Sequence, residues 1–489
     1  MANRVITGSP GGHVLFLDLE AVAQRHNVVQ TVVEAEKHTK NPVLPLGDVG
    51  EWDSLQAKPW ASRSVIYDEE EQLFKSWYTG IDIGHTVHTT GYAISDNGID
   101  WHKPKLGLFE YNGNKENNIC IESGYGPVIK DPLEEDVSKR YKLILKQGAT
   151  HPDKITLAYS ADGIEWRDGP IMEEPQWDGR RPDIGGLIRD DQDPDPNRRY
   201  KYTWMSVHPA NKPGPEIVRT QSLGCGPDVE HLLGITANPI LHPNDGLEQE
   251  LHFIMLSPYA GQYVVLYEYG WYMPNGTGKF GSYNADIRLA ASRDGAHYRR
   301  VNPNEPVIRR GSHGEWDDGF LVISDKPIVK DDKIYLYYSG NSAEWTSWPW
   351  QNKIDRDADI QTGFIRTTRM GLATLRLDGF TVLETADRET PGSFETIPFY
   401  ADAAIGVWIN VADVLPRRSW IEVEVVDGET GEVMKGYERG ACCPLHSDSV
   451  RAKVVWSQNR RLPAKQSLRL RFHLMGAARL HSFGFEEVR

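Results

Sequence analysis

Cysteine is scarce in this chain, and long apolar runs are absent. Only four of the 489 residues are cysteines, and the adjacent pair Cys442 and Cys443 is poorly placed for a disulfide framework. No run approaches the roughly 18 apolar residues of a transmembrane helix. The N-terminal segment also lacks the apolar core of a secretory signal. We therefore expect a cytoplasmic protein that does not bind membranes.

Positive charge is also in short supply. The chain has 54 Lys and Arg against 69 Asp and Glu, for a net charge of −15. A nucleic-acid-binding protein needs a basic face to neutralise phosphates, so the sequence predicts no nucleic-acid partner. What is abundant instead is Trp (15), Tyr (21), Gly (45) and Pro (30), a composition typical of short strands joined by tight turns.

A short motif, Ser-x-Asp/Asn-Gly-x-x-Trp/Tyr, recurs along the chain. It stands at 95–101 (SDNGIDW), 160–166 (SADGIEW) and 292–298 (SRDGAHY). The second interval is about twice the first, which indicates one degenerate copy between them. Each copy reads as a strand, a turn whose glycine takes a positive φ, and a second strand.

A second motif, a β-rich run containing tyrosine, accompanies the first. It occurs five times, as FKSWY, YKLIL, YKYTW, YVVLY and YLYY at 74–78, 141–145, 200–204, 263–267 and 335–338. Five units of similar length and about four strands each predict a five-bladed β-propeller rather than a β-solenoid or two β-sandwiches. We assign it to residues 1–385, with a strand from 13–35 closing the ring.

After residue 385 both motifs stop. The segments AIGVWINV, WIEVEVV, VRAKVVW and SLRLRFHL alternate in strand fashion at 404–411, 420–426, 450–456 and 467–474. The sequence therefore predicts an all-β protein, with a C-terminal β-sandwich over residues 386–489.

Three consecutive repeats place acids where their innermost strands are expected to begin. Carboxylates that share a pocket but come from different strands can have separated pKa values, which suits acid/base or nucleophilic chemistry. The candidates are Asp183, Glu248, Glu250, Asp318 and Asp325. Trp-Asp pairs at Asp53, Asp178 and Asp317 recur between repeats, and we interpret these three as structural.

Loops near the same positions supply candidates for substrate binding. Tryptophan in a loop commonly stacks on sugar rings, although it can equally pack a neighbouring loop or a subunit interface. The histidines have no metal-ligand spacing, so we predict neither a metal nor another cofactor. The candidates are Trp60, Arg63, His88, His151, Arg180, Arg181, His208, Trp271, Trp345 and Trp348.

A family resemblance follows from these features. A five-bladed propeller followed by a β-sandwich resembles glycoside hydrolase families 32 and 68, and the propeller alone resembles families 43, 62 and 130. Residues 95–120 and 160–166 are similar to blade motifs of family 32-like proteins. In this family pattern, Asp183 resembles the second of three acids, and Glu248 or Glu250 the third. The segment KPWASRS has no acid where the first is expected, so Asp53, Asp318 or Asp325 would replace it.

The function we predict is hydrolysis of a small oligosaccharide or glycoside, furanosides included. Glu250, with Glu248 as the alternate, would donate a proton to the leaving oxygen. Asp318 or Asp325 would act as base or nucleophile, and Asp183 would orient the substrate. Two alternatives stay open: a non-catalytic carbohydrate-binding propeller, and a phosphorylase or glycosyltransferase on the same scaffold. A homo-oligomer is a further expectation.

Overall fold

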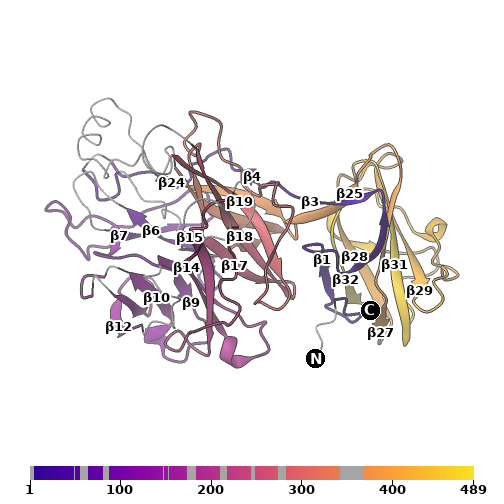
Figure 1. Cartoon of the computed structure of the whole chain (residues 1–489), viewed down its shortest axis with the longest axis horizontal. Coiled ribbons are helices and arrows are strands. Elements are labelled where there is room, and N and C mark those ends of the chain that lie inside the picture. The colour runs from indigo at the N-terminus through magenta and orange to yellow at the C-terminus, as the bar shows by residue number, and fades with distance from the viewer. Residues whose placement is uncertain are drawn as a thin grey trace.

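The computed structural model describes residues 5–48, 50–54, 64–80, 88–146, 148–151, 154–172, 183–209, 217–243, 248–273, 282–341 and 368–488. Over these residues the protein is all-β: the strands form seven sheets, and the helical segments are short 3₁₀ turns. Figure 1 shows five of the sheets gathered on one side and two on the other. Within the described residues, no helix is long and apolar enough to cross a membrane.

Sheets 1 to 3 follow one another along the chain, and each pairs its strands in sequence order. Sheet 1 contains β5 (Ser64–Asp68), β6 (Leu73–Gly80), β7 (Thr89–Ser95) and β8 (Ile119–Ile121). Sheet 2 contains β9 (Val128–Lys130), β10 (Tyr141–Lys146), β11 (Ile155–Ser160) and β12 (Arg167–Ile171). Sheet 3 contains β13 (Asp183–Arg189), β14 (Tyr200–Pro209), β15 (Ile217–Gly226) and β16 (Leu233–Gly234).

Sheets 4 and 5 continue this pattern. Sheet 4 contains β17 (Ile254–Tyr259), β18 (Gln262–Met273), β19 (Ser282–Ser292) and β20 (Arg299–Arg300). Sheet 5 contains β21 (Leu321–Ile323), β22 (Ile328–Lys330), β23 (Lys333–Asn341) and β24 (Thr368–Arg376). Its outer strand comes from the other end of the chain, because β4 (Glu36–Lys37) pairs with β24.

The prediction that residues 13–35 close this set of sheets is wrong. β1 (His13–Leu15), β2 (Val22–His26) and β3 (Val28–Val32) pair with β32, β26 and β25 instead. The two residues of β4 that follow them complete sheet 5. Alternating apolar residues mark all these segments as strands, but alternation does not specify the partner of a strand.

Sheets 6 and 7 form the second part of the molecule. Sheet 6 holds β1, β3, β25 (Thr381–Thr385), β28 (Ile405–Ala412), β30 (Ser449–Val454) and β32 (Arg479–Glu487). Sheet 7 holds β2, β26 (Gly392–Thr396), β27 (Phe399–Ala401), β29 (Trp420–Asp427) and β31 (Gln466–Met475). The pairing of β25 places 381–385 with this part, just before the boundary expected at 386.

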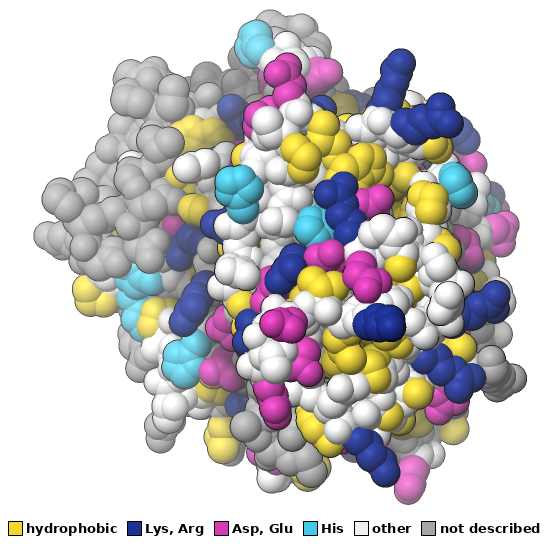
Figure 2. Space-filling model, turned by 90° about the vertical axis from the view of Figure 1, so that its right-hand side faces the viewer, with side chains coloured by type: hydrophobic (Ala, Val, Ile, Leu, Met, Phe, Trp, Pro, Cys, Tyr) yellow, Lys and Arg dark blue, Asp and Glu magenta, His cyan; other side chains and the backbone are white. Residues whose placement is uncertain are grey.

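The two sheets of the second part share a single apolar core. Residues of both sheets form it, among them Phe394, Phe472 and Phe483, all at most 1% exposed. The outward face of sheet 7 carries ion pairs instead, such as Arg471 and Arg469 to Glu395 at 2.9 and 3.0 Å. Figure 2 shows acidic and basic side chains lying together on this side of the molecule.

The Ser-x-Asp-Gly motifs form the predicted turns and also join neighbouring sheets. Gly98, Gly163 and Gly295 have φ of 73°, 80° and 67°. Their carbonyl oxygens accept hydrogen bonds from adjacent sheets; Trp77 of sheet 1, for example, donates to Gly163 of sheet 2 at 2.6 Å. The degenerate copy lies at Asp228, whose carboxylate accepts the same pair of backbone N–H bonds as Asp162 and Asp294.

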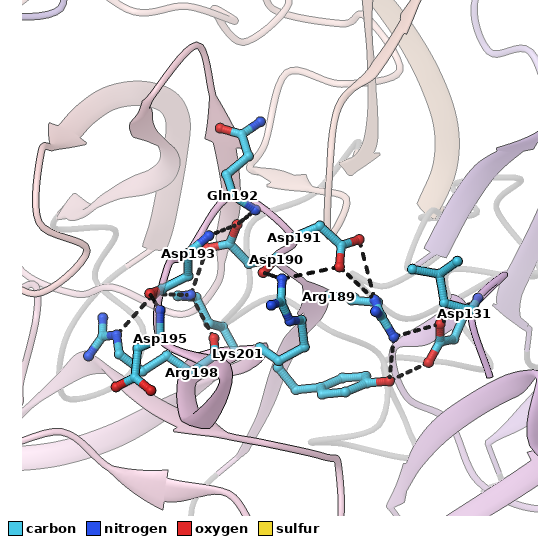
Figure 3. Close-up of polar contacts among 12 residues, drawn as sticks. Asp131, Arg189, Asp190, Asp191, Gln192, Asp193, Asp195, Arg198 and Lys201 are labelled. Atoms are coloured by element: carbon cyan, nitrogen blue, oxygen red, sulfur yellow. Dashed lines mark hydrogen bonds and ion pairs between the residues drawn. The ribbon is translucent and has the colours of Figure 1, made fainter. Parts of the chain in front are cut away.

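A second repeated contact joins sheets 1 to 4, and we call it the seam. An aspartate after the innermost strand pairs with a lysine of its own sheet and accepts a bond from a tyrosine of the next. Lys201 lies between Asp190 and Asp193 at 2.6 and 2.8 Å, as Figure 3 shows. The three seam sets are Asp68, Lys75 and Tyr141; Asp131, Lys142 and Tyr200; and Asp190, Lys201 and Tyr263.

Sheet 5 contacts sheet 1, and the two parts of the molecule also meet. Tyr337 of sheet 5 donates to the Gly98 carbonyl at 2.7 Å. Asp378, after β24, accepts bonds from Tyr259 of sheet 4 and from Ser482 of sheet 6, and its carboxylate pairs with His13 at 2.9 Å. These contacts bring sheets from distant parts of the sequence together.

Candidate functional site

The Trp-Asp pairs are held by structural contacts. The indole rings of Trp52 and Trp316 lie against glycines of the adjacent hairpins, where a Cβ would come within 2.8 Å of the ring. Each neighbouring carboxylate accepts a tyrosine hydroxyl and pairs with a lysine: Tyr78 (2.8 Å) and Lys103 (2.6 Å) at Asp53, Tyr338 (3.0 Å) and Lys37 (2.6 Å) at Asp317. This duplicated geometry supports the structural interpretation of Asp53 and Asp317; Asp178 lies outside the described residues.

Asp325 lies where the inner strands of three sheets approach one another. It follows β21 in sheet 5 and is 5% exposed. Ser64, the first residue of β5 in sheet 1, donates to its carboxylate at 2.6 Å. A Cβ placed on Gly186 of β13 in sheet 3 would lie 3.5 Å from the same carboxylate. Asp325 therefore lies between sheets 1, 3 and 5.

Asp183 is the first residue of β13 and is only partly buried. Lys146 of sheet 2 pairs with its carboxylate at 2.6 Å, and the Tyr125 hydroxyl lies 3.4 Å from the same oxygen. The ring of His88 packs edge-on against Tyr125, at 4.7 Å between centroids. Sheets 1, 2 and 3 thus bring Asp183 and His88, two predicted site residues, into one cluster.

Glu250 is held ahead of β17 by the neighbouring sheet. Its carboxylate accepts the backbone N–H of Arg219 at 3.2 Å and pairs with the Arg219 guanidinium at 3.1 Å. His252, two residues on, lies between two carboxylates: its Nε2 is 3.9 Å from Glu250 and its Nδ1 is 3.6 Å from Glu268. Glu268 is fully buried on β18.

Two other predicted acids, Glu248 and Asp318, have contacts away from the inner strands. Glu248 is fully buried and pairs at 2.7 Å with Arg300 of β20, the outermost strand of sheet 4. Asp318 accepts the Gly314 N–H at 2.7 Å within the turn before β21, and exposed His313 lies 3.5 Å away. Neither contact involves an inner strand.

The three remaining acids occupy the same end of the sheets. Asp183 begins β13 and pairs in register with Met205, which in turn pairs with Gln221. Arg219, the partner of Glu250, lies two residues closer to the start of β15 than Gln221 does. Gly186, next to Asp325, is three residues along β13 from Asp183, or about 10 Å. Asp325 therefore lies deeper along the inner strands than Asp183.

The remaining predicted contacts lie around this end or outside the described residues. Trp271, on β18, is half-buried, and the Arg310 guanidinium lies 5.1 Å from the centre of its ring. His151 and His208 are half-buried at the ends of sheets 2 and 3. Trp60, Arg63, Arg180, Arg181, Trp345 and Trp348 lie outside the described residues.

Lysine side chains accompany two of these acids: Lys146 pairs with Asp183, and Lys326 follows Asp325 in the chain. Burial lowers the pKa of the Lys326 ammonium, while the adjacent carboxylate of Asp325 opposes the shift. Among the described residues, no group of three or more His, Cys, Asp and Glu side chains is arranged to hold a metal ion. The chemistry that this arrangement offers is proton transfer and electrostatic stabilisation by carboxylates.

Sequence reasoning missed His252 and Glu268. A signal for His252 was present, because Glu248, Glu250 and His252 alternate in GLEQELH and alternate residues share one side of an extended chain. Glu268 gave no such signal, since it lies within the apolar run of β18 and reaches His252 only through the pairing of the folded chain.

Comparisons with known proteins find only solved structures of low sequence identity. No family model matches the sequence, and no curated protein matches it either. A putative glycoside hydrolase from Parabacteroides distasonis is 15% identical, with a TM-score of 0.44, covering 70% of this chain and 97% of the other.

Two further solved structures also show low similarity to this chain. One is described as belonging to the GH130 family of mannoside phosphorylases, which contains glycoside hydrolases that target β-1,2 mannosidic linkages in Candida mannan; it is 15% identical, with a TM-score of 0.43, covering 71% of this chain and 94% of that one. The other, a fructofuranosidase from Schwanniomyces occidentalis, is 8% identical, with a TM-score of 0.38 and coverage of 91% and 100%. At these scores the likeness carries no argument about activity.

Proposed function

We propose that this protein is a glycoside-active enzyme whose sheets 1 to 5 form a closed five-bladed β-propeller, followed by a β-sandwich of sheets 6 and 7. The contact between sheets 5 and 1 supports ring closure. The proposed reaction is hydrolysis of a small oligosaccharide or glycoside in the central pocket. Carboxylates carry this chemistry by protonating the leaving oxygen and stabilising an oxocarbenium-like transition state.

Asp325 carries the proposal. A buried carboxylate that is held by sheet 1, lies over sheet 3 and belongs to sheet 5 has no role in pairing strands. A carboxylate that is buried where several sheets meet is a candidate for a functional residue. We assign it the role of base or nucleophile in place of the acid that the first repeat lacks.

The other two acids receive roles from their partners. Asp183 pairs with Lys146 and is partly exposed, so it is suited to orient sugar hydroxyls. Glu250 is the proposed proton donor. His252 lies between it and Glu268, and this arrangement offers a route for returning the proton after each turnover.

The test is turnover on a panel of aryl glycosides, furanosides included, extended to β-1,2-mannobiose and nystose. Wild type is compared with Asp183→Asn, Glu250→Gln and Asp325→Asn. Asp318→Asn is the matched control, because it removes an aspartate charge at a turn away from these three acids. We expect each of the three variants to lose about 10²- to 10³-fold in kcat/KM and the control to keep wild-type activity.

The same panel separates the alternatives. Turnover that requires added phosphate and yields a sugar phosphate would replace hydrolysis by phosphorolysis. Binding of a sugar without turnover under either condition would favour the carbohydrate-binding propeller. Full activity in Asp325→Asn would exclude the assigned role of that residue.

A further inference from the structure

Sheet 1 carries an insertion that the other sheets lack. In sheets 2, 3 and 4, residues 161–166, 227–232 and 293–298 connect the third strand to the fourth. In sheet 1 the same connection is residues 96–118. The Ser-x-Asn-Gly turn is retained at its start, so the additional chain is the segment 102–118, which we call the blade-one insertion.

The blade-one insertion folds back to the segment that precedes β5. A small hairpin pairs Tyr111 with Asn114 through two backbone bonds. Asn112, at its tip, donates to the Gly50 carbonyl at 3.1 Å. At the other end of the insertion, Asn118 accepts the indole N–H of Trp52 at 3.0 Å. These bonds fix both sides of a cavity of about 330 Å³ between the insertion and residues 50–53.

The lining of this cavity is mixed in polarity and almost balanced in charge. Two lysines and three acids face it, together with four asparagines and the side chains of Trp52 and Tyr111. Such a lining does not select an anion, because its acids offset its lysines. It does not suit an apolar ligand either, because such sites are lined predominantly by hydrophobic side chains.

A neutral polyhydroxyl ligand matches these groups. Asn117 and Asn118 use their side-chain amides for hydrogen bonds within the protein. The side chains of Asn112 and Asn114, with the lysines as donors and the carboxylates as acceptors, can serve hydroxyl groups, which both donate and accept. Lys105 and Glu116 pair with each other at 2.8 Å while remaining 67% and 70% exposed, so both can also reach a ligand. Half-buried Tyr111 adds an aromatic ring for the apolar face of a sugar.

The cavity lies at the same end of the sheets as the candidate site. The Trp52 ring packs on Gly80 and Gly91, at the hairpin end of β6 and β7. Ser64, which begins β5 and contacts Asp325, pairs with Trp77 of β6, three residues before Gly80. The third strand of a sheet is about 10 Å from its inner strand. A chain of sugar units that starts at the centre and crosses sheet 1 would therefore reach the cavity.

We propose that this cavity is a distal subsite for one unit of a neutral oligosaccharide whose other end lies at the candidate site. The inference rests on the proposed function and adds to it: the enzyme would prefer oligosaccharides to simple glycosides. The blade-one insertion, rather than the central acids, would set this preference.

The decisive variant is Asn114→Trp, which fills the cavity from an exposed hairpin position. Lys115→Trp is the matched control, because the neighbouring residue is exposed but does not line the cavity. The probes are mannotetraose, xylotetraose, cellotetraose and nystose, with 4-nitrophenyl monoglycosides for comparison. We expect Asn114→Trp to raise KM at least tenfold for the tetrasaccharide that wild type accepts and to leave the monoglycoside unchanged. Glu116→Gln should give a smaller increase.

Unchanged KM for the tetrasaccharide in Asn114→Trp, or an equal increase in Lys115→Trp, would overturn the subsite. If wild type turns over none of the probes, the proposed function fails and titration calorimetry with the same tetrasaccharides decides the subsite separately. Binding to wild type and Lys115→Trp but not to Asn114→Trp would support it. Equal binding to all three, or binding to none, would refute it.

Discussion

The two ends of strand β13 carry aspartates of opposite kinds. Asp183 begins the strand, and Asp190 follows it about 20 Å away. Asp190 is fully buried and contacts Lys201 of its own sheet and Tyr263 of the next. Asp183 is partly exposed and has Lys146 at 2.6 Å. Both carboxylates thus contact a neighbouring sheet, but only that of Asp183 keeps part of its surface exposed.

Repetition distinguishes these two ends more clearly than burial does. At the seam, sheets 1, 2 and 3 repeat the same aspartate, lysine and tyrosine contacts. At the other end, each sheet presents a different residue, such as Ser64, Asp183 or Asp325. A contact that recurs at every junction serves what all junctions share, namely packing. Residues that differ between sheets can make different contacts with the different groups of an asymmetric ligand.

The largest expected effect is on the seam. Lys201→Met leaves Asp190 and Asp193 buried without their shared cation, and we expect a loss of about 3–5 kcal/mol in the free energy of unfolding. Denaturant titration monitored by circular dichroism measures it. Lys142→Met, at the equivalent position of sheet 2, should behave alike, and wild-type stability in both variants would show that the seam does not hold the sheets together.

The opposite end should respond in activity rather than stability. Asp183→Asn keeps the size of a partly exposed side chain and removes a single charge, so we expect the free energy of unfolding to change by less than about 1 kcal/mol. Any glycosidase activity should fall by about 10²-fold or more. A variant that unfolds more easily yet remains active would place Asp183 with the seam residues.

A glycine at a sheet junction tests the repeat itself. Gly163→Ala would place a Cβ 2.7 Å from the Trp77 ring at a φ of 80°, and we expect a loss of about 2–3 kcal/mol from clash and backbone strain together. Gly431→Ala is the control, because Gly431 has a φ of 76° with open space around it, and its loss should be about 1 kcal/mol. Equal midpoints of thermal unfolding would mean that the junction contact contributes nothing.

The smallest effect concerns the junction between sheets 1 to 5 and sheets 6 and 7. Burial, with nearby Arg376 and Arg479, lowers the pKa of His481 to about 3 from its ordinary value of 6.5. The unfolded chain therefore takes up a proton below pH 6.5 that the folded protein does not take up until about pH 3. We expect the free energy of unfolding to fall by about 1 kcal/mol over the first pH unit below 6.5.

The slope of unfolding free energy against pH, measured by denaturant titration between pH 7 and 5, tests this expectation. His481→Gln should reduce the slope, whereas His313→Gln, at a fully exposed position, should leave it as in wild type. An unchanged slope in His481→Gln would mean that the histidine is charged in the folded protein.

Much of the fold was readable from the sequence, and the reason is local. The glycine turns at Gly98, Gly163 and Gly295 each need a conformation that few other residues adopt, so they mark the ends of strands wherever they occur. The degenerate copy at Asp228 was predicted from spacing alone, and its carboxylate makes the same turn bonds as the intact copies. Such features involve residues close in sequence.

The candidate site was readable only in part. Asp183 begins an inner strand, Glu250 precedes one and Asp325 follows one, but Glu248 and Asp318 occupied equally suitable positions in the sequence. Their pairing with Arg300 and with the Gly314 N–H depends on where other segments lie. His252 and Glu268 likewise meet only because the segment ahead of β17 runs beside β18.

The sequence by itself therefore determined the strands, the turns and the number of repeating units, because these depend on backbone conformation and on alternation over a few residues. Only the tertiary structure decided that β1, β2 and β3 join sheets 6 and 7, and which partners each carboxylate contacts. Strand pairing is made through backbone hydrogen bonds that any residue but proline can form. The choice of partner thus rests on the packing of the whole chain, and so does the environment of each carboxylate.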